Sequence, residues 1–385
     1  MIPAVHISVP SLTTLTLHLT HGHVPALKDF LDTVGDLCPN ISRVRIRIHR
    51  PHNLSELSET ICRHIQRLMK LRVLDSRGVT LDTDMILRLS ENLSLKHLSF
   101  SLNPDAPVDW ITSSSSAPMF QNLAYLGVAS QSLESVTGLL SCIRLPVVEN
   151  LDADFTANPS KETFRSYITT VRNICSPDSL AKFRIHGIRN PETPDIRSSH
   201  RLTLDDVRPC MAFVNIRSIH INLPRWSIEL TDSDLLELVS AWPHIHTLCI
   251  NDEWGWRTTG GITLHGLSQL LYTRRSLSYL CIAIDTESYS DLPPKPYTCF
   301  LPLPNPLTIN LVDSLIRKAE DVPRLADAFW KLGLHPCCFL AWDGMEMEDQ
   351  EDDMVYHHQK HEWSRVFDGV DQGPPREQYL EVESA

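Results

Sequence analysis

Residues 11–20 read SLTTLTLHLT, a stretch in which apolar residues alternate with threonine and histidine. Such alternation predicts a β-strand with one buried face, which here carries Leu15, Leu17 and Leu19. Together with Leu12, the strand fits the frame L-x-x-L-x-L, whose last two leucines belong to the strand itself. The frame matters because it recurs along the chain.

Nine further segments fit this frame, and each starts 24 to 36 residues after the one before it. They begin at Ile41, Leu71, Leu95, Leu123, Val148, Leu180, Ile216, Ile245 and Leu277. Two weaker segments follow at 305–311 and 337–342. A period of about 29 residues with one strand in each unit is typical of the long class of leucine-rich repeat.

The segments between the strands have helical spacing of their apolar residues, most clearly at 25–37, 55–70, 231–242 and 262–275. Strands that alternate with helices form a parallel sheet. We therefore predict an α/β leucine-rich-repeat solenoid with about 11–12 irregular repeats. Its parallel sheet lines the concave face and its helices cover the convex face.

The repeats are predicted to form a single solenoid over residues 1–344, with long Pro- and Ser-rich loops at 103–119, 187–202 and 285–306. Ahead of the first strand, the alternating residues Val5, Ile7 and Val9 are candidates for a partial capping strand. Residues 345–385 start with the acidic run EMEDQEDD and are predicted to form an acidic C-terminal tail with a short helix near YHHQKHEWSRVF.

The composition excludes several classes of protein. A net charge of −12 argues against general binding of nucleic acid, which needs a basic surface. The sequence contains no apolar run near the length of a membrane span and no secretory signal. Its ten cysteines are scattered and form no C-x-x-C pair, so we expect reduced structural thiols in a cytoplasmic or nuclear protein; the alternative is a disulfide framework.

Two long stretches resemble the repeats of the F-box/leucine-rich-repeat-like family of mushroom-forming (basidiomycete) fungi. They read LTLDDVRPCMAFVNIRSIHINLPRWSIELTDSDLLELVSAWPHIHTLCINDEWGW and ITLHGLSQLLYTRRSLSYLCIAID, and the likeness is strongest at 203–285. The family combines an F-box, which docks on the adaptor of a cullin-type ubiquitin ligase, with repeats that present a substrate. The LP-x-E-[IL] opening of the F-box is absent from this chain, so the resemblance implies the substrate-recognition part only.

Within each predicted strand, the residues between the buried leucine positions face the concave surface. We expect a protein partner to bind there, and a ligase adaptor only if an F-box lies upstream. The candidate partner-binding residues are Arg43, Arg45, Arg47, His97, Asp152, Asp154, Arg184, His220, Asn251, Trp254 and Trp256.

Three features of this set have two interpretations each. RVRIRI at 43–48 predicts a row of arginines that binds an acidic peptide or phosphate, or else a solvated strand face. Asp152 and Asp154 form the opposite spot, with the same alternative. Trp254 and Trp256 in NDEWGW are candidate anchors for a partner, or else cover the edge of the repeats.

The sequence favours no catalytic or metal site. It contains no G-x-S-x-G, P-loop or G-x-G-x-x-G motif, and HHQKH at 357–361 lacks the glutamate of H-E-x-x-H and a nearby third ligand. We therefore expect a non-catalytic interaction module without cofactor or metal. The substrate-recognition repeats of an F-box protein are the first interpretation, and a free-standing scaffold or decoy without a ligase role is the alternative.

Overall fold

The computed structural model describes residues 12–19, 24–48, 54–65, 67–68, 70–102, 120–188, 200–258, 261–287, 307–332, 339–342 and 350–372. The chain divides into two compact units, Met1–Thr193 (unit 1) and Pro194–Ala385 (unit 2). The predicted capping strand, most of the three predicted loops and Cys337–Cys338 lie outside the described residues. None of the described helices has the length and apolar character that crossing a membrane requires.

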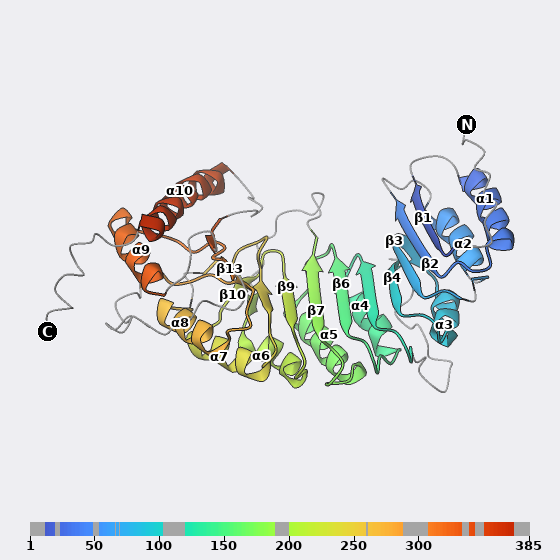
Figure 1. The fold of residues 1–385 in the computed structure, drawn as a ribbon, viewed down its shortest axis with the longest axis horizontal. Helices are drawn as coiled ribbons and strands as arrows, with labels where there is room; N and C mark the ends of the chain where they lie inside the picture. The colour runs from blue at the N-terminus through green and yellow to red at the C-terminus, as the bar shows by residue number, and fades with distance from the viewer. Residues whose placement is uncertain are drawn as a thin grey trace. The chain divides into compact units, whose positions relative to one another are not determined.

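Unit 1 is an alternation of strands and helices. Its strands are β1 (Thr14–Leu19), β2 (Arg43–Ile48), β3 (Val73–Leu81), β4 (His97–Leu102), β5 (Tyr125–Ser130), β6 (Asn150–Phe155) and β7 (Lys182–Gly187). Its helices are α1 (Val24–Leu37), α2 (Leu54–Ile65), α3 (Thr83–Glu91), α4 (Leu133–Ser141) and α5 (Lys161–Ile174). Each strand pairs in parallel with the next strand along the chain, and the helices lie on one side of the strands (Figure 1).

Unit 2 repeats this scheme with shorter elements. Its main parallel strands are β9 (Ser218–Asn222), β11 (Thr247–Ile250), β12 (Tyr279–Cys281), β13 (Thr308–Asn310) and β14 (Phe339–Leu340). A separate parallel pair consists of β8 (Arg201–Leu202) and β10 (Ser227–Ile228). The helices are α6 (Leu204–Val207), α7 (Asp232–Ala241), α8 (Leu264–Thr273), α9 (Val322–Lys331) and α10 (Gln350–Gln372), with 3₁₀ turns at Arg208–Ala212 and Ala319–Asp321.

The strands form where the repeated frame predicts them, because the frame supplies one apolar face per strand. In β2, Val44 and Ile46 are each 2% exposed and Ile41, which starts the frame, is fully buried. The residues between them point to the other side of the sheet. The predicted α/β fold with parallel strands and one helix layer is thus confirmed in each unit, and the weak segments at 305–311 and 337–342 contain β13 and β14.

Helices start at the polar residues that precede the apolar runs. Before α7, the side chain of Thr231 accepts a hydrogen bond from the backbone of Asp234, and the Asp234 side chain accepts one from the Thr231 backbone. This reciprocal arrangement satisfies two amide groups that a helix start leaves unpaired. Ser160 and Thr263 cap α5 and α8 through a single side-chain bond each.

The C-terminal segment differs from the predicted tail with a short helix. Helix α10 spans Gln350–Gln372 and packs against α9. On α10, Trp363 is 1% exposed and donates its indole N–H to the carbonyl of Ser314 at 2.8 Å. The amide of Gln359 bonds both backbone groups of Ile316, at 2.7 and 3.0 Å. The acidic start of the helix concealed an apolar face that belongs to the core of unit 2.

Candidate functional site

The face of the unit 1 strands that points away from the helices, which we call the open face, holds the predicted row of arginines. Arg43, Arg45 and Arg47 alternate in β2 with buried Val44 and Ile46, so all three side chains are exposed on this face. We call these three residues the arginine stripe. The prediction that they share one face is confirmed.

The arginine stripe is only lightly neutralised by its surroundings. Arg45 lies opposite Asp75 of β3, and Arg47 approaches the same carboxylate at 3.9 Å with a side chain that is 63% exposed. Asp75 also accepts a hydrogen bond from Ser99 at 3.0 Å. Within the described part of the chain, Arg43 and Arg45 form no ion pair. On the other side of the stripe, the β1 residues opposite the three arginines carry no acidic group; they are Thr14, Thr16 and His18.

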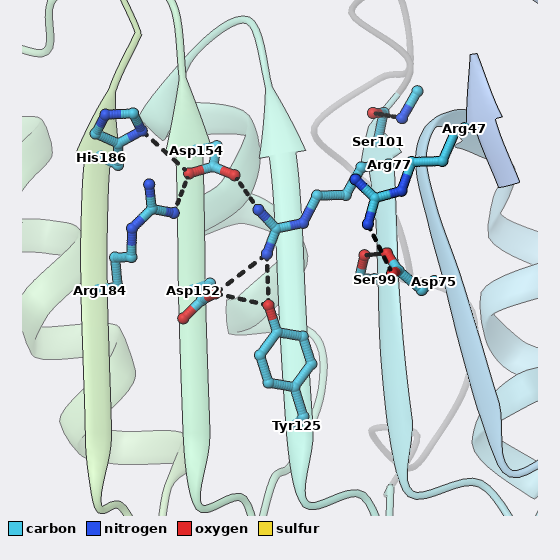
Figure 2. Close-up of polar contacts among 11 residues, drawn as sticks. Arg47, Asp75, Arg77, Ser99, Ser101, Tyr125, Asp152, Asp154, Arg184 and His186 are labelled. Carbon is cyan, nitrogen blue, oxygen red and sulfur yellow. Dashed lines mark hydrogen bonds and ion pairs between the residues drawn. The ribbon is translucent and has the colours of Figure 1, made fainter. Parts of the chain in front are cut away.

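A different arginine, Arg77, makes the densest polar contacts on the open face. It lies at a break in the register of β3 between Ser76 and Thr80, where Gly78 adopts a φ of 100°. That dihedral lies in a region that L residues with a side chain rarely adopt, so glycine suits this bulge. At this bulge the side chain of Arg77 extends over the neighbouring strands (Figure 2).

The guanidinium of Arg77 reaches strands β5 and β6. It donates to the hydroxyl of Tyr125 at 2.5 Å, to Asp152 at 3.1 Å and to Asp154 at 2.8 Å. Tyr125 in turn donates to Asp152 at 2.6 Å. Gly127 leaves room for this path, because a Cβ there would lie 3.2 Å from a terminal nitrogen of Arg77 and 2.9 Å from the Tyr125 hydroxyl.

Strand β7 adds two residues to these contacts. We call the whole set the Arg77 network; it consists of Arg77, Tyr125, Asp152, Asp154, Arg184 and His186. Arg184 donates to the second oxygen of Asp154 at 2.6 Å, and His186 lies 3.5 Å from that oxygen (Figure 2). Burial alone would raise the pKa of Asp154, but the hydrogen bond with His186 and the charges of Arg184 and Arg77 outweigh it and hold this pKa below its ordinary value. Asp154 is therefore a carboxylate at neutral pH.

The charges of the predicted acidic spot are therefore paired within the fold. Asp154 is 7% exposed and Asp152 shares its oxygen with Arg77 and Tyr125. Arg184, predicted to meet a partner, is likewise held by Asp154. These charges pair with cations from neighbouring strands, because two partly buried carboxylates on one strand need cations within reach.

His97 and His220 also have partners inside the fold. His97 stacks on the ring of Tyr125, with centroids 4.0 Å apart and an angle of 3° between the planes. Burial is the main reason that the pKa of His97 lies below its ordinary value. In unit 2, the Nε2 of His220 lies 2.9 Å from a carboxylate oxygen of Asp252.

Asn251, Trp254 and Trp256 do not face solvent, so the structure does not support their prediction as partner-binding residues. Their exposed fractions are 0%, 3% and 0%. Trp256 donates its indole N–H to the Ile250 carbonyl at 2.8 Å, and its backbone N–H to Asp313 at 2.7 Å. The loop thus folds back onto the end of β11 and onto Asp313, which agrees with the structural alternative stated for the tryptophans.

Sequence reasoning missed Arg77, Tyr125 and Gly127. The only signal for the first was the Arg–Gly pair directly after the weak third position of its frame, Ser76. A glycine within a strand pattern suggests a bulge, and a bulge redirects a neighbouring side chain. Nothing in the sequence indicated that the redirected residue would reach β6, three strands along the order of the sheet.

The histidines of HHQKH do not form a metal centre with other described ligands. His357 and His361 are exposed on α10, and neither belongs to a group of three or more described histidine, cysteine or acidic side chains that come together. Such a group occurs instead at His220, Cys249 and Asp252. The cysteines that the structure describes are free thiols, as the sequence predicts.

Comparisons with known proteins add little to this picture. No protein-family model matches the chain, and no curated protein matches it. Among solved structures, the chain is similar to one in the complex of Rad7 and Elc1 from yeast, with 11% sequence identity and a TM-score of 0.36. That match covers 73% of this chain and 77% of the other. A likeness at this level carries no argument about function.

Proposed function

We propose that this chain is a non-catalytic interaction module that binds an acidic segment of a protein partner on the open face of unit 1. The observation that carries the proposal is the arginine stripe. It is a row of three exposed guanidinium groups on one strand, of which Arg43 and Arg45 have no ion pair within the described part of the chain.

The spacing of the stripe matches an extended partner. Alternate residues of a strand lie about 6.6 Å apart, and alternate side chains of an extended peptide have the same repeat. Carboxylates at every second residue of a bound segment would therefore meet Arg43, Arg45 and Arg47 in turn. Arginine suits this role because its planar group binds a carboxylate or phosphate through two parallel hydrogen bonds.

The charge of the rest of the molecule makes the stripe selective. The chain carries a net charge of −12, so an acidic partner is repelled by most of its surface and attracted locally by the stripe. The Arg77 network adds no second charged site, because its arginines and carboxylates already pair with each other. We therefore assign the recognition of charge to β2.

Peptide binding tests the proposal directly. The probe is a fluorescein-labelled peptide with glutamate at every second position and serine between, measured by fluorescence anisotropy. Reversing the charge at the middle of the stripe with Arg45→Glu should weaken binding about fivefold or more, since one exposed attraction becomes a repulsion. The melting temperature should stay nearly unchanged because the side chain is exposed.

Lys28→Glu is the matched control. Lys28 is exposed on α1 of the same unit, and its substitution changes the net charge by the same amount. It should leave the peptide affinity within about twofold. Equal losses from Arg45→Glu and Lys28→Glu, or equal binding of a lysine version of the peptide, would contradict the proposal. A large loss of stability in Arg45→Glu would show that the residue is structural.

We further propose that the bound protein is a substrate of a ubiquitin ligase, as the resemblance to F-box repeat proteins implies. Affinity purification of the chain from its source cells tests this step separately. Recovery of a cullin or its adaptor supports the ligase role. Recovery of an acidic partner without either favours the free-standing scaffold.

A further inference from the structure

A cluster of metal-ligating side chains occurs in unit 2, independent of the arginine stripe. Strands β9 and β11 pair in parallel with His220 opposite Cys249, and Asp252 follows two residues after β11 ends. One ligand atom from each of these three residues lies within 4.8 Å of the other two. The cluster thus joins a nitrogen, a sulfur and an oxygen donor.

A rigid turn brings Asp252 to this position. Asn251, the first residue after β11, has a φ of 55° and is fully buried. Its side chain accepts a hydrogen bond from the backbone N–H of Leu223 at 2.6 Å and donates to the carbonyls of Leu223, Trp226 and Gly255. The chain therefore turns back beside β9, and the Asp252 carboxylate meets the His220 ring at 2.9 Å.

We propose that His220, Cys249 and Asp252 form a binding site for Zn²⁺. Zinc takes histidine nitrogen, cysteine sulfur and carboxylate oxygen as ligands, each about 2.0–2.3 Å from the ion in a tetrahedron. Ligand atoms in such a tetrahedron lie roughly 3.4–3.8 Å apart. Donors that lie within 4.8 Å of one another therefore need to approach by about 1.4 Å at most. The His220 and Asp252 atoms that lie 2.9 Å apart need to separate by about 0.5 Å, and side-chain rotation supplies both changes.

A fourth donor stands next to the cluster. Cys281 of β12 lies opposite Cys249 in the parallel register, and its thiol contacts the carbonyl of Ile250 at 3.8 Å. Cys281 is fully buried, and its thiol does not belong to the group of atoms that lie within 4.8 Å of one another. It is therefore a candidate fourth ligand only after a shift of its side chain.

The cluster is open enough for an ion to enter and closed enough to hold it. The side chains of His220 and Asp252 are 25% and 21% exposed, whereas Cys249 is 1% exposed. The contact with Cys281 and burial hold the pKa of the Cys249 thiol well above its ordinary value, so the thiol is protonated without metal. Burial lowers the pKa of His220, but the hydrogen bonds with Asp252 and Cys249 outweigh it and raise this pKa to about 10, so the ring is also protonated without metal. Zinc binds thiolate and neutral imidazole, so two protons leave, one from Cys249 as the Zn–S bond forms and one from His220 as the Zn–N bond forms.

Cobalt titration of the full chain tests the site. After treatment with a chelator, the protein is titrated with Co²⁺, which reports thiolate ligation by a near-ultraviolet charge-transfer band. We expect a band that saturates at about one equivalent and disappears when Zn²⁺ is added. We also expect Zn²⁺ to raise the melting temperature, since a ligand that binds only the folded state stabilises it.

Variants then assign the ligands. Cys249→Ser should abolish the charge-transfer band. Asp252→Asn, which leaves the buried thiol in place, should weaken cobalt binding at least tenfold. Cys175→Ser, which removes a buried thiol in unit 1, is the control and should bind like the wild-type chain. Circular dichroism verifies that each variant is folded.

Three results would overturn the proposal. They are the absence of cobalt binding by the wild-type chain, a charge-transfer band that survives Cys249→Ser, and cobalt bound without a thiolate band. The last result places the ion on exposed histidines such as His357 and His361 of α10. None of these results affects the arginine stripe, which lies in unit 1.

Discussion

At the residue scale, the charge on the open face of unit 1 depends on the long side chain of Arg77 and on the glycine that it passes. Arg77 extends over the neighbouring strands past Gly127, where a Cβ would lie 3.2 Å from its guanidinium and 2.9 Å from the Tyr125 hydroxyl. Its charge is then shared by the two carboxylates of β6, which are otherwise adjacent like charges. Together with Arg184, this bulged residue neutralises the two carboxylates and links β3, β6 and β7.

The Asp154 carboxylate should make the stability of the protein depend on acid pH. Because its pKa is lower in the folded state than in the unfolded chain, its contribution is present above about pH 4 and is lost as pH falls further. Urea unfolding of wild type and Asp154→Asn between pH 7 and pH 3 measures this. The wild-type advantage should shrink toward low pH, and a constant difference would contradict the assignment.

Gly127→Ala should destabilise the protein by about 1–3 kcal/mol, as overpacking in a tight site does. The added Cβ would lie 2.9 Å from the Tyr125 hydroxyl and 3.2 Å from Arg77, so both groups must move and their hydrogen bonds lengthen. Chemical denaturation gives the loss. The same change in an Arg77→Ala background should cost less, and equal penalties in the two backgrounds would show that Arg77 does not depend on the gap.

At the scale of elements, the repeats depend on how their ends are closed. Unit 2 uses α10, whose buried Trp363 and Gln359 bond the backbone that follows β13. The carbonyl of Val312 still accepts a hydrogen bond from the backbone N–H of Trp342, but the Ser314 carbonyl and both backbone groups of Ile316 bond side chains of α10. Side chains of a helix therefore satisfy groups that a neighbouring repeat would otherwise pair.

Gln359→Ala should lower the free energy of unfolding by about 2–4 kcal/mol, because it leaves the buried N–H and C=O of Ile316 without their partners. His358→Ala is the control, since His358 is exposed on the same helix and should change stability by less than about 0.5 kcal/mol. Equal effects of the two substitutions, measured by urea unfolding, would mean that α10 does not close unit 2 through Gln359.

At the scale of the whole molecule, the distribution of charge separates the arginine stripe from its surroundings. The chain has 47 aspartate and glutamate residues but only 35 lysine and arginine residues. On the open face of unit 1, the described acidic side chains either pair with arginines of the Arg77 network or lie beside the stripe. The electrostatic field of a basic row on an acidic protein both attracts an acidic partner and orients it as it approaches.

Binding of the alternating glutamate peptide should therefore weaken as salt increases. The three arginines are exposed, and exposed charges are screened beyond about 8–10 Å at physiological ionic strength. Anisotropy titrations in 0.05 M and 0.5 M sodium chloride measure the effect, and the affinity should fall at least severalfold. A salt-independent affinity would show that the peptide binds through apolar contacts and not through the stripe.

The strands and helices were predictable because their physical cause is local. Alternation in RVRIRI places Arg43, Arg45 and Arg47 opposite a buried face, whatever the rest of the chain does. Helix α10 was recognised only in part, because its acidic start hides the buried positions that surround Trp363. The tryptophan loop was ambiguous, since a ring that anchors a partner and one that closes an edge have the same sequence pattern.

The sequence by itself thus determined the repeat, the parallel strands and the face on which each strand residue lies, because these follow from periodicity within a few residues. Only the tertiary structure decided which charges on that face pair with each other. Arg77 meets Asp154 after a separation of 77 residues, and His220 meets Asp252 after 32. Such contacts depend on the register between strands and on the turn at Asn251, and both are set by packing across repeats.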